Sequence, residues 1–368
     1  MKNYKILIFH KIVSLFFVLL ILLAPALEST VLIRMFGSVN KDELVSAVAL
    51  PTTPVPPTRP NLSTNTVTDA LSPTQFGYQA SIASRVVNNK SDFLLMSDQN
   101  SGATFDYQKQ GSSFGNTEMM FALWTIYTKN NPNANYVIYL GQDTTIGSPV
   151  DDNGAVGTLS SSNISFADLN GRAKSITIVS DFNDNVNSTA SNQNGKKLIF
   201  AVFNPVNNTV AQWFLGVPTI LRNVNVGTNM SDTFLVPSWL KIYAQGSPFA
   251  FSNGAYIWNS NGAVVNAMVY GGSDTRDLIT DTSVWIGSSG QVGNNFSVFG
   301  GNEKSGTITG NTRVTIANTT GTDTFQTMSG GSLAGTIKGN TSLNIKTNNT
   351  YIKRIFGGGV GLSTATDL

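Results

Sequence analysis

Hydrophobic residues in the C-terminal third of the chain fall in short alternating runs that recur at a fixed spacing. Gly-Gly pairs separate these runs and begin at residues 271, 300, 330 and 357, which are 29, 30 and 27 residues apart. Between two of these pairs, residues 306–316 (GTITGNTRVTI) match residues 335–345 (GTIKGNTSLNI) at seven of eleven positions. Residues 278–286 keep the apolar positions of this unit but lack its glycines. The pattern predicts strands within an internal repeat of about 29 residues.

Runs this short cannot form a sheet with a core of its own, so successive coils must stack on one another as a parallel β-solenoid. The predicted stacked pairs are Ile308 over Ile337, Val314 over Leu343 and Ile316 over Ile345. We also expect Asn311 and Asn340 to form an asparagine ladder, and the glycines to permit positive φ at tight corners. The rival fold is an antiparallel sandwich, but it requires strands about every 8 to 12 residues without a fixed 29-residue register.

Residues 117–129 carry the clearest helical pattern. Apolar residues at i, i+3, i+4 and i+7 predict a buried face made of Met120, Leu123, Trp124 and Tyr127. The sequence Asn-Asn-Pro-Asn at 130–133 ends this helix. After it, the β-branched and aromatic runs at 136–140, 144–146 and 174–179 are predicted strands.

The N-terminus resembles an export signal. Lys2, Lys5 and Lys11 precede an uncharged apolar run that closes at Ala24-Pro25-Ala26, as a signal peptidase site would. An uncleaved membrane anchor is the alternative, and either would leave the rest of the chain outside the cytoplasm. We therefore predict an extracellular protein, secreted or attached to the cell surface.

The chain divides into four predicted regions. Residues 1–27 are the signal peptide, and residues 28–62 are a disordered Pro/Thr-rich linker that includes five prolines between Pro51 and Pro60. Residues 63–116 are poorly defined, with one strand-like run at 93–96. Residues 117–368 form the β-helix, whose coils are clearest from residue 269 onward.

Composition excludes much chemistry. Charged residues make up 12% of the chain, there is no Cys, and the one His, His10, lies in the signal segment. Thiol catalysis, disulfides and Cys-ligated zinc are therefore excluded, and a mature chain without the signal has no imidazole base. No basic run exceeds two residues, so we predict no nucleic-acid partner and no membrane partner beyond the signal segment. An exported chain without Cys also favours a bacterial, Gram-positive source.

The remaining candidates for chemistry are carboxylates. They are Asp151 with Asp152, Asp181 with Asp184, the group Asp274, Asp277 and Asp281, and the two glutamates after the linker, Glu118 and Glu303. Polysaccharide hydrolases need paired carboxylates, and lyases need Ca²⁺ on clustered carboxylates with an Arg or Lys base, which Asp274-Thr275-Arg276-Asp277 approaches most closely. At corners, however, Asp is more often a turn residue that bonds the backbone.

We predict no catalytic residue, no cofactor and no metal site. Residues 181–192 begin like an EF-hand loop but have Val186 and Asn192 where that loop needs Gly and Glu. Trp213, Trp239, Trp258 and Trp285 are candidates for a sugar-stacking surface, although most aromatics belong to a core in such a fold.

The order of signal, linker, helix, strands and Gly-Gly coils resembles the pectate-lyase-like right-handed β-helix regions of Gram-positive surface adhesins. The resemblance rests on residues 121–146 as cap and first coil, on rungs at 175–178, 221–226 and 240–246, and on the GTITGNTRVTI-type units. It covers residues 117–368 and implies an all-β, right-handed parallel β-helix with an N-terminal cap helix. It specifies architecture and not a ligand.

By this resemblance we expect a non-enzymatic adhesin or stalk module with a glycan or protein ligand on the solenoid surface. A carbohydrate-active β-helix enzyme of the polysaccharide lyase type is the alternative, because parallel β-helices also host such enzymes. The sequence contains neither a closing cap nor a sorting motif after Gly357-Gly358-Gly359, so a fragment or truncated chain is expected.

Overall fold

The structure is a computed structural model that describes most of the chain from residue 69 to residue 361. The described ranges are 69–79, 81–83, 93–98, 104–109, 116–146, 165–180, 196–200, 210–228, 238–252, 254–257, 265–287, 296–317, 324–347 and 351–361. The predicted signal peptide (1–27) and linker (28–62) lie outside these ranges.

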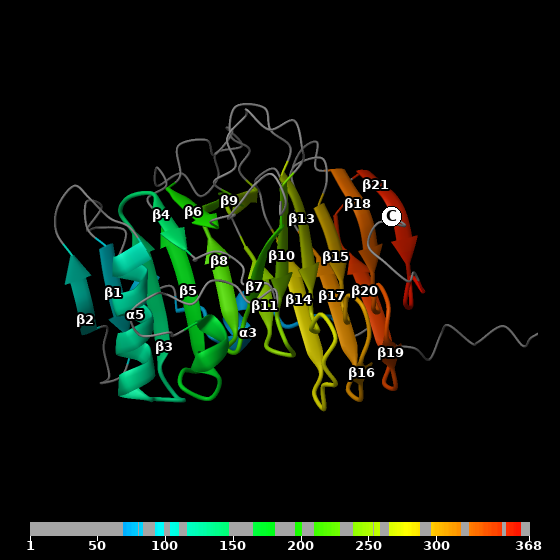
Figure 1. Cartoon of the computed structure of the whole chain (residues 1–368), viewed down its shortest axis with the longest axis horizontal. Helices are drawn as coiled ribbons and strands as arrows, with labels where there is room; N and C mark the ends of the chain where they lie inside the picture. The colour runs from blue at the N-terminus through cyan, green and yellow to red at the C-terminus, as the bar shows by residue number, and fades with distance from the viewer. Residues whose placement is uncertain are drawn as a thin grey trace, which may run out of the picture. The chain divides into compact units, whose positions relative to one another are not determined.

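Parallel strands from successive coils build the longest sheet, which has nine strands among the described residues (Figure 1). Its parallel members, in spatial and chain order, are β3 (Asn135–Leu140), β5 (Ser175–Ser180), β8 (Thr219–Arg222), β11 (Phe249–Phe251), β14 (Thr282–Ile286), β17 (Thr312–Ile316) and β20 (Thr341–Ile345). At the N-terminal end, β1 (Phe93–Ser97) joins β3 antiparallel, and β2 (Thr104–Lys109) joins β1 antiparallel.

Three further sheets complete the coils within the described part of the chain. The six-stranded sheet holds β7 (Val210–Phe214), β10 (Ser238–Tyr243), β13 (Val265–Tyr270), β15 (Phe296–Phe299), β18 (Thr324–Ser329) and β21 (Tyr351–Phe356). A four-stranded sheet holds β4 (Thr144–Ile146), β6 (Lys197–Phe200), β9 (Asn225–Thr228) and β12 (Tyr256–Ile257), and a two-stranded sheet pairs β16 (Thr307–Ile308) with β19 (Thr336–Ile337). The predicted all-β parallel β-helix is confirmed, and the sandwich is excluded.

The predicted register is confirmed residue by residue in the C-terminal coils. Val314 pairs with Leu343, Ile316 with Ile345, and Ile308 with Ile337. The degenerate unit keeps the same register, since Val284 pairs with Val314. Val284, Val314 and Ile316 are buried in one continuous apolar core, against which Leu343 and Ile345 pack partly buried. Each fully buried aliphatic side chain contributes roughly 1.5 to 3 kcal/mol.

The asparagine ladder exists, but its bonds differ from amide-to-amide contacts. The Asn311 side-chain oxygen accepts the backbone N–H of Asn340 at 2.9 Å, and the Asp281 carboxylate accepts the backbone N–H of Asn311 at 2.8 Å. Each side chain thus bonds the main chain of the following coil, and Asp281 is the first member of the ladder.

Close packing between coils, and not positive φ, explains the Gly-Gly pairs. Positive φ occurs at Gly306 (86°) and Gly335 (99°), which open the GTI units, but not at the first three Gly-Gly pairs. A Cβ on Gly300 would overlap the carbonyl oxygen of Gly330, and one on Gly271 would overlap that of Gly300. The expectation of positive φ was therefore wrong for these pairs, where the missing Cβ lets consecutive coils approach.

A threonine ladder runs beside the glycines. The hydroxyls of Thr282, Thr312 and Thr341 donate to the carbonyl oxygens of Gly300, Gly330 and Gly357, the last two bonds measuring 2.5 and 2.9 Å. Thr282 and Thr312 are fully buried. The two buried bonds satisfy polar groups that would cost about 1 to 3 kcal/mol each if left unpaired.

The cap helix α5 (Asn116–Lys129) starts within one residue of its predicted position, but its buried face was partly wrong. Met119, Ala122, Leu123 and Ile126 enter the core, whereas Trp124 is 45% exposed. Both sets follow i, i+3, i+4, i+7 spacing and share Leu123. The structure selects the set that contains the small Ala122, and Met120 and Tyr127 pack partly buried at its edge.

A strap, residues 69–79, crosses the outer face of the nine-stranded sheet, and it includes the short helix α3 (Pro73–Phe76). Its polar contacts reach coils along much of the solenoid. At the C-terminal coils, Asp69 pairs with Lys346 and the Ala70 N–H donates to Thr315 Oγ1 at 2.8 Å. Towards the N-terminal coils, the Leu71 N–H donates to Ser283 Oγ at 2.7 Å, and Ser175 Oγ donates to the Gly77 carbonyl oxygen at 3.3 Å. The region without a sequence assignment therefore ties together coils that are far apart along the solenoid.

The strap also covers apolar residues on the outside of the same sheet. Phe76 is buried with Ile220 and Ala250, and Trp285 packs against this cluster. The Arg222 guanidinium lies 4.8 Å from the centre of the Tyr78 ring. An outward-facing row that would otherwise meet water thus becomes a small apolar cluster outside the central core.

We expect Gly300→Ala to lower the free energy of unfolding by about 2 kcal/mol, because the new methyl group meets the backbone of the next coil. Gly357→Ala is the matched control, since it holds the same place in the repeat and no described atom beyond its chain neighbours lies within 4 Å of where the new methyl group would sit. We expect that variant to stay within about 0.5 kcal/mol of the wild type. Urea unfolding followed by circular dichroism compares the two, and equal losses would contradict the close-packing explanation.

Candidate functional site

The carboxylates of the predicted corner cluster bond neighbouring main chain and side chains. Asp277 accepts the backbone N–H of Thr307 at 2.6 Å, just as Asp281 accepts that of Asn311. Asp274 accepts the hydroxyl of Ser273 at 3.0 Å. Two of the three therefore join one coil to the next. The other predicted pairs, Asp151 with Asp152 and Asp181 with Asp184, lie outside the described residues, as does the EF-hand-like segment.

Asp281 is ionised in this setting. The backbone N–H of Asn311 is the main cause that lowers the pKa of Asp281 below its ordinary 3.8, and Arg313, whose guanidinium lies 2.8 Å away, lowers it further. A carboxylate that favours its charged form cannot serve as the protonated general acid of a hydrolase.

Glu303 forms the cluster that sequence reasoning missed. One carboxylate oxygen lies 2.5 Å from the Lys241 ammonium, and the other accepts a hydrogen bond from the Tyr243 hydroxyl. The Glu303 side chain is 2% exposed and that of Lys241 is 13% exposed. Gln212 completes the group by donating to the Tyr243 hydroxyl oxygen at 3.4 Å. A buried acid, a cation and a phenol thus meet on one side of the solenoid.

Strand alternation explains how these residues meet. In β10, Leu240 and Ile242 point into the core, so Lys241 and Tyr243 point outward from the six-stranded sheet. Glu303 follows the Gly300-Gly301 corner after β15, where its N–H donates to the carbonyl of Ser273 at 2.9 Å. It lies 62 residues after Lys241, which is close to two repeat lengths. That spacing was the available signal in the sequence.

An aromatic ladder extends from Tyr243 along the same outer face. The rings of Phe214, Tyr243, Tyr270 and Phe299 stack with centroid distances of 4.6, 5.2 and 5.0 Å and interplanar angles of 11 to 14°. Burial, followed by the Glu303 charge, raises the pKa of Tyr243 and of Tyr270 well above the ordinary 10. Tyr243 therefore stays protonated and keeps donating to Glu303.

The geometry of this cluster fits a structural role better than a catalytic one. The Lys241 side-chain nitrogen is already engaged by the Glu303 carboxylate in a largely buried ion pair. A glycosidase needs a second carboxyl group about 5 to 9.5 Å away, and the Glu303, Lys241, Tyr243 and Gln212 group contains only one. Across the described ranges, no three acidic or histidine side chains are placed to hold a metal ion.

Of the four tryptophans proposed for sugar stacking, the two whose side chains the structure describes are not exposed. Trp213 is buried in the core, and Trp285 packs partly buried beneath the strap. The side chains of Trp239 and Trp258 lie outside the described set. Among the tryptophan side chains that the structure describes, the exposed one is Trp124, which the helical pattern had assigned to the core.

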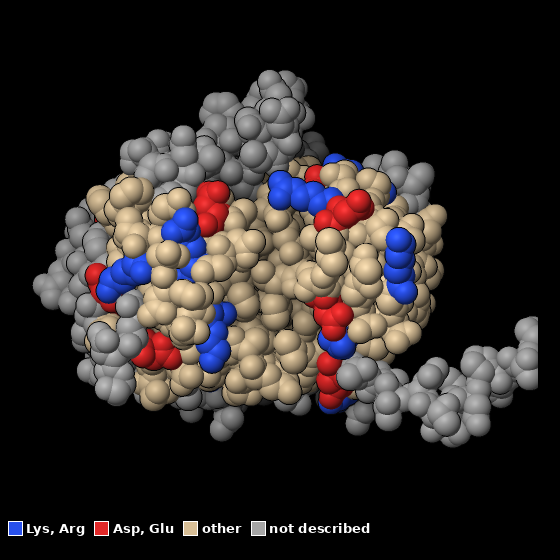
Figure 2. All heavy atoms as spheres, turned by 90° about the horizontal axis from the view of Figure 1, so that it is seen from below, with Lys and Arg blue, Asp and Glu red and all other residues tan. Residues whose placement is uncertain are grey.

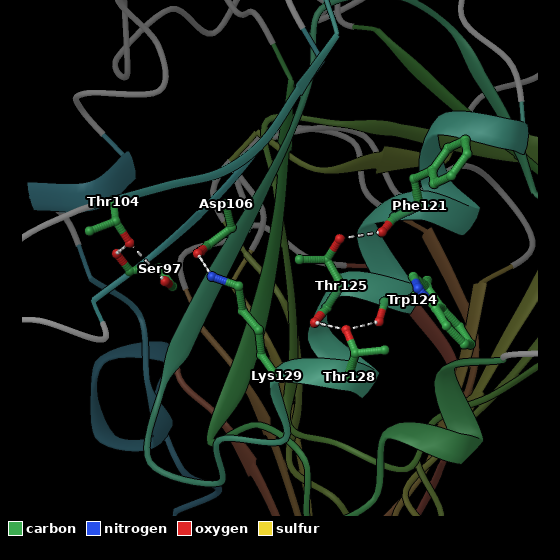
Figure 3. Close-up of polar contacts among 8 residues, drawn as sticks. All are labelled: Ser97, Thr104, Asp106, Phe121, Trp124, Thr125, Thr128 and Lys129. Atoms are coloured by element: carbon green, nitrogen blue, oxygen red, sulfur yellow. Dashed lines mark hydrogen bonds and ion pairs between the residues drawn. The ribbon is translucent and has the colours of Figure 1, made fainter.

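Trp124 lies on an aromatic strip of the cap helix. Figure 3 shows Phe121 and Trp124 projecting from α5 on the side away from the Lys129–Asp106 ion pair. The ring of Trp124 stacks on that of Tyr127, with centroids 6.3 Å apart and planes inclined by 21°. The Arg172 guanidinium carbon lies 3.9 Å from the centre of the Tyr127 ring. We call Phe121, Trp124 and Tyr127 the aromatic strip.

Charge on the surface is sparse and mixed. In Figure 2, basic and acidic side chains are scattered over a largely uncharged face. Among the helices that the structure describes, none is long and apolar enough to cross a membrane.

The fold and these sites define the chain as a parallel β-helix protein with an exposed aromatic strip and a buried group of Glu303, Lys241 and Tyr243, which we call the Glu303 brace. No protein-family model, curated protein or solved structure matches the chain.

We expect Glu303→Gln to lower the free energy of unfolding by roughly 3 kcal/mol, because it leaves the largely buried Lys241 ammonium without a counter-charge. Lys241→Met combined with Glu303→Gln removes the unpaired charge and is expected to recover part of the loss. Urea unfolding of the single and double variants measures the coupling. Strictly additive losses would show that the two side chains do not act as a pair.

We expect Asp281→Asn to change stability little at neutral pH, within about 1 kcal/mol, because Asn already occupies the equivalent position in the next two coils and the Arg313 pair is partly exposed. The two proteins are expected to differ in acid. Ionised Asp281 contributes stability above its unfolded pKa of 3.8, and this contribution is lost as pH falls through the lowered folded value.

The measurement is the thermal midpoint of each protein at neutral pH and at steps below pH 4. We expect the wild-type midpoint to fall more steeply in acid than that of Asp281→Asn. Parallel curves would mean that Asp281 has the same pKa folded and unfolded.

Proposed function

We propose that the protein is a non-enzymatic extracellular adhesin or stalk module, similar to the pectate-lyase-like β-helix regions of Gram-positive surface adhesins. The observation that carries this proposal is the use of the corner carboxylates. Asp277 and Asp281, two of the carboxylates that are candidates for a glycan-cleaving site, instead accept main-chain N–H groups of the next coil. Carboxylates that bond the next coil stabilise the stack of coils, which suits a stalk better than a catalytic site.

The coil architecture also supports a stalk. Backbone ladders join successive coils in three longer sheets, and the Asp/Asn and Thr ladders add bonds between coils at the corners. Such a stack gains length by repetition while each coil contacts only its neighbours. The proposed location outside the cell rests on the predicted signal segment.

A carbohydrate-active enzyme of the polysaccharide lyase type is the second candidate. The observation in its favour is the meeting of Glu303, Lys241 and Tyr243 on the outer face of the six-stranded sheet. For Lys241 to act as a base, its amine would have to leave the ion pair with Glu303, so the enzyme proposal needs a rearranged site.

The test incubates the full chain with plant, microbial and host glycans and with immobilised host matrix proteins, with and without Ca²⁺. Binding and the release of unsaturated or reducing-end products are both followed. We expect binding without products under either condition. Product release that disappears in Glu303→Gln, Asp274→Ala or Asp277→Ala would replace the adhesin by the enzyme. Asp281→Asn controls for a general effect of removing a corner carboxylate.

A further inference from the structure

The aromatic strip of α5 is unusual for the solvent side of a cap helix. Phe121 and Trp124 are 44% and 45% exposed, although a helix that closes a core needs apolar residues only on its inner face. The inner face is already complete with Met119, Leu123 and Ile126. The exposed rings are therefore not needed to close the core.

The strip is held in one arrangement before any ligand binds. Trp124 stacks on Tyr127, and Tyr127 is fixed in turn by the Arg172 guanidinium, which also donates to the Tyr127 carbonyl oxygen at 3.3 Å. Preorganised rings lose little rotamer freedom on binding, which favours affinity from a small contact. Arg172 carries five N–H donors, of which this contact uses one.

Polar groups border the strip in a way that suits hydroxyl groups. Thr125 and Thr128 donate their hydroxyl protons to the helix carbonyls of Phe121 and Trp124, at 2.7 and 2.9 Å, so their oxygens present acceptor lone pairs. The Arg172 guanidinium, which contacts the Tyr127 ring, adds N–H donors beside the strip. A pyranose ring combines a C–H face, which the negative face of an indole attracts, with a rim of hydroxyls that donate and accept.

The size of the strip distinguishes a sugar from a protein partner. An aromatic side chain offers about 150 to 250 Å², so two rings that are 44% and 45% exposed present on the order of 200 Å² together. A stable protein interface needs about 800 Å² from each partner. The strip is therefore too small for a protein interface and matches one or two sugar rings.

We propose that the outer face of α5 is a glycan-binding site in which a pyranose stacks on Trp124, beside Phe121 and Tyr127, and hydrogen-bonds to Arg172. The inference deepens the proposed function, because it rests on the adhesin reading and names the class of ligand and its place. Binding at the cap leaves the coils free to act as the stalk that holds it.

The experiment measures binding of cellohexaose, chitohexaose and hexagalacturonate to the full chain by calorimetry, with the indole N–H signals followed by NMR. We expect at least one of the three sugars to bind the wild type and to shift a single indole signal, absent from Trp124→Ala. Affinity is expected to fall roughly tenfold or more in Trp124→Ala and to be partly restored in Trp124→Phe, which keeps an aromatic face.

Tyr351→Ala is the matched control, since Tyr351 is an exposed aromatic residue of β21, 65% exposed, in the last described coil. We expect its sugar affinity to equal that of the wild type. Circular dichroism and the thermal midpoint check that each variant folds. Wild-type affinity in a folded Trp124→Ala, or binding of none of the three sugars by the wild type, would overturn the glycan site. If such a chain still bound other glycans or matrix proteins without turnover, the adhesin proposal would stand.

Discussion

The hydrogen-bonded register between successive coils is the constraint on which the rest of the structure depends. Each coil must present the same backbone path to its neighbours at the strand spacing of about 4.8 Å, so a residue suits its position only if it also suits the coils before and after it. Apolar side chains meet this condition where Val314 stacks over Leu343 and Ile316 over Ile345. At the Gly300-Gly301 corner, the absence of a side chain meets it. The ladders of Thr312 and Asn311 meet it with side chains that bond the next main chain.

The same register brings residues together that are remote in the sequence. A displacement of two repeats places Glu303 against Lys241 and Tyr243, and residues of the strap reach coils more than 200 positions further along the chain. Both features lie on outward faces, where strand alternation would otherwise expose them to water. The solenoid thus has buried structure outside its central core, which explains why Trp285 and Tyr270 pack away from solvent although their strands point them outward.

The repeat made much of the C-terminal fold predictable from sequence, because identical spacing implies identical stacking. Residues 306–316 and 335–345 were placed in their correct register on that ground alone. The strap could not be predicted, since Asp69 and Phe76 carry no periodic pattern and their partners are set by the finished solenoid. Trp124 was misplaced because two helical faces shared Leu123, and the sequence does not show which one meets the coil beneath. Glu303 was recognised as a surviving glutamate, but its partners become visible only once two coils are stacked.

These constraints bear on where a β-helix of this kind can place a binding function. Within the repeating coils, a substitution alters the packing against both neighbouring coils. Many outward positions there are already covered by the ladders, the strap or the Glu303 brace. On the outer face of α5, Phe121 and Trp124 are 44% and 45% exposed, and neither belongs to the buried core that the coils share. Stability is therefore concentrated in the repeat, and surface chemistry is freest at the cap. The proposed stalk with a glycan site on its cap helix is consistent with that division.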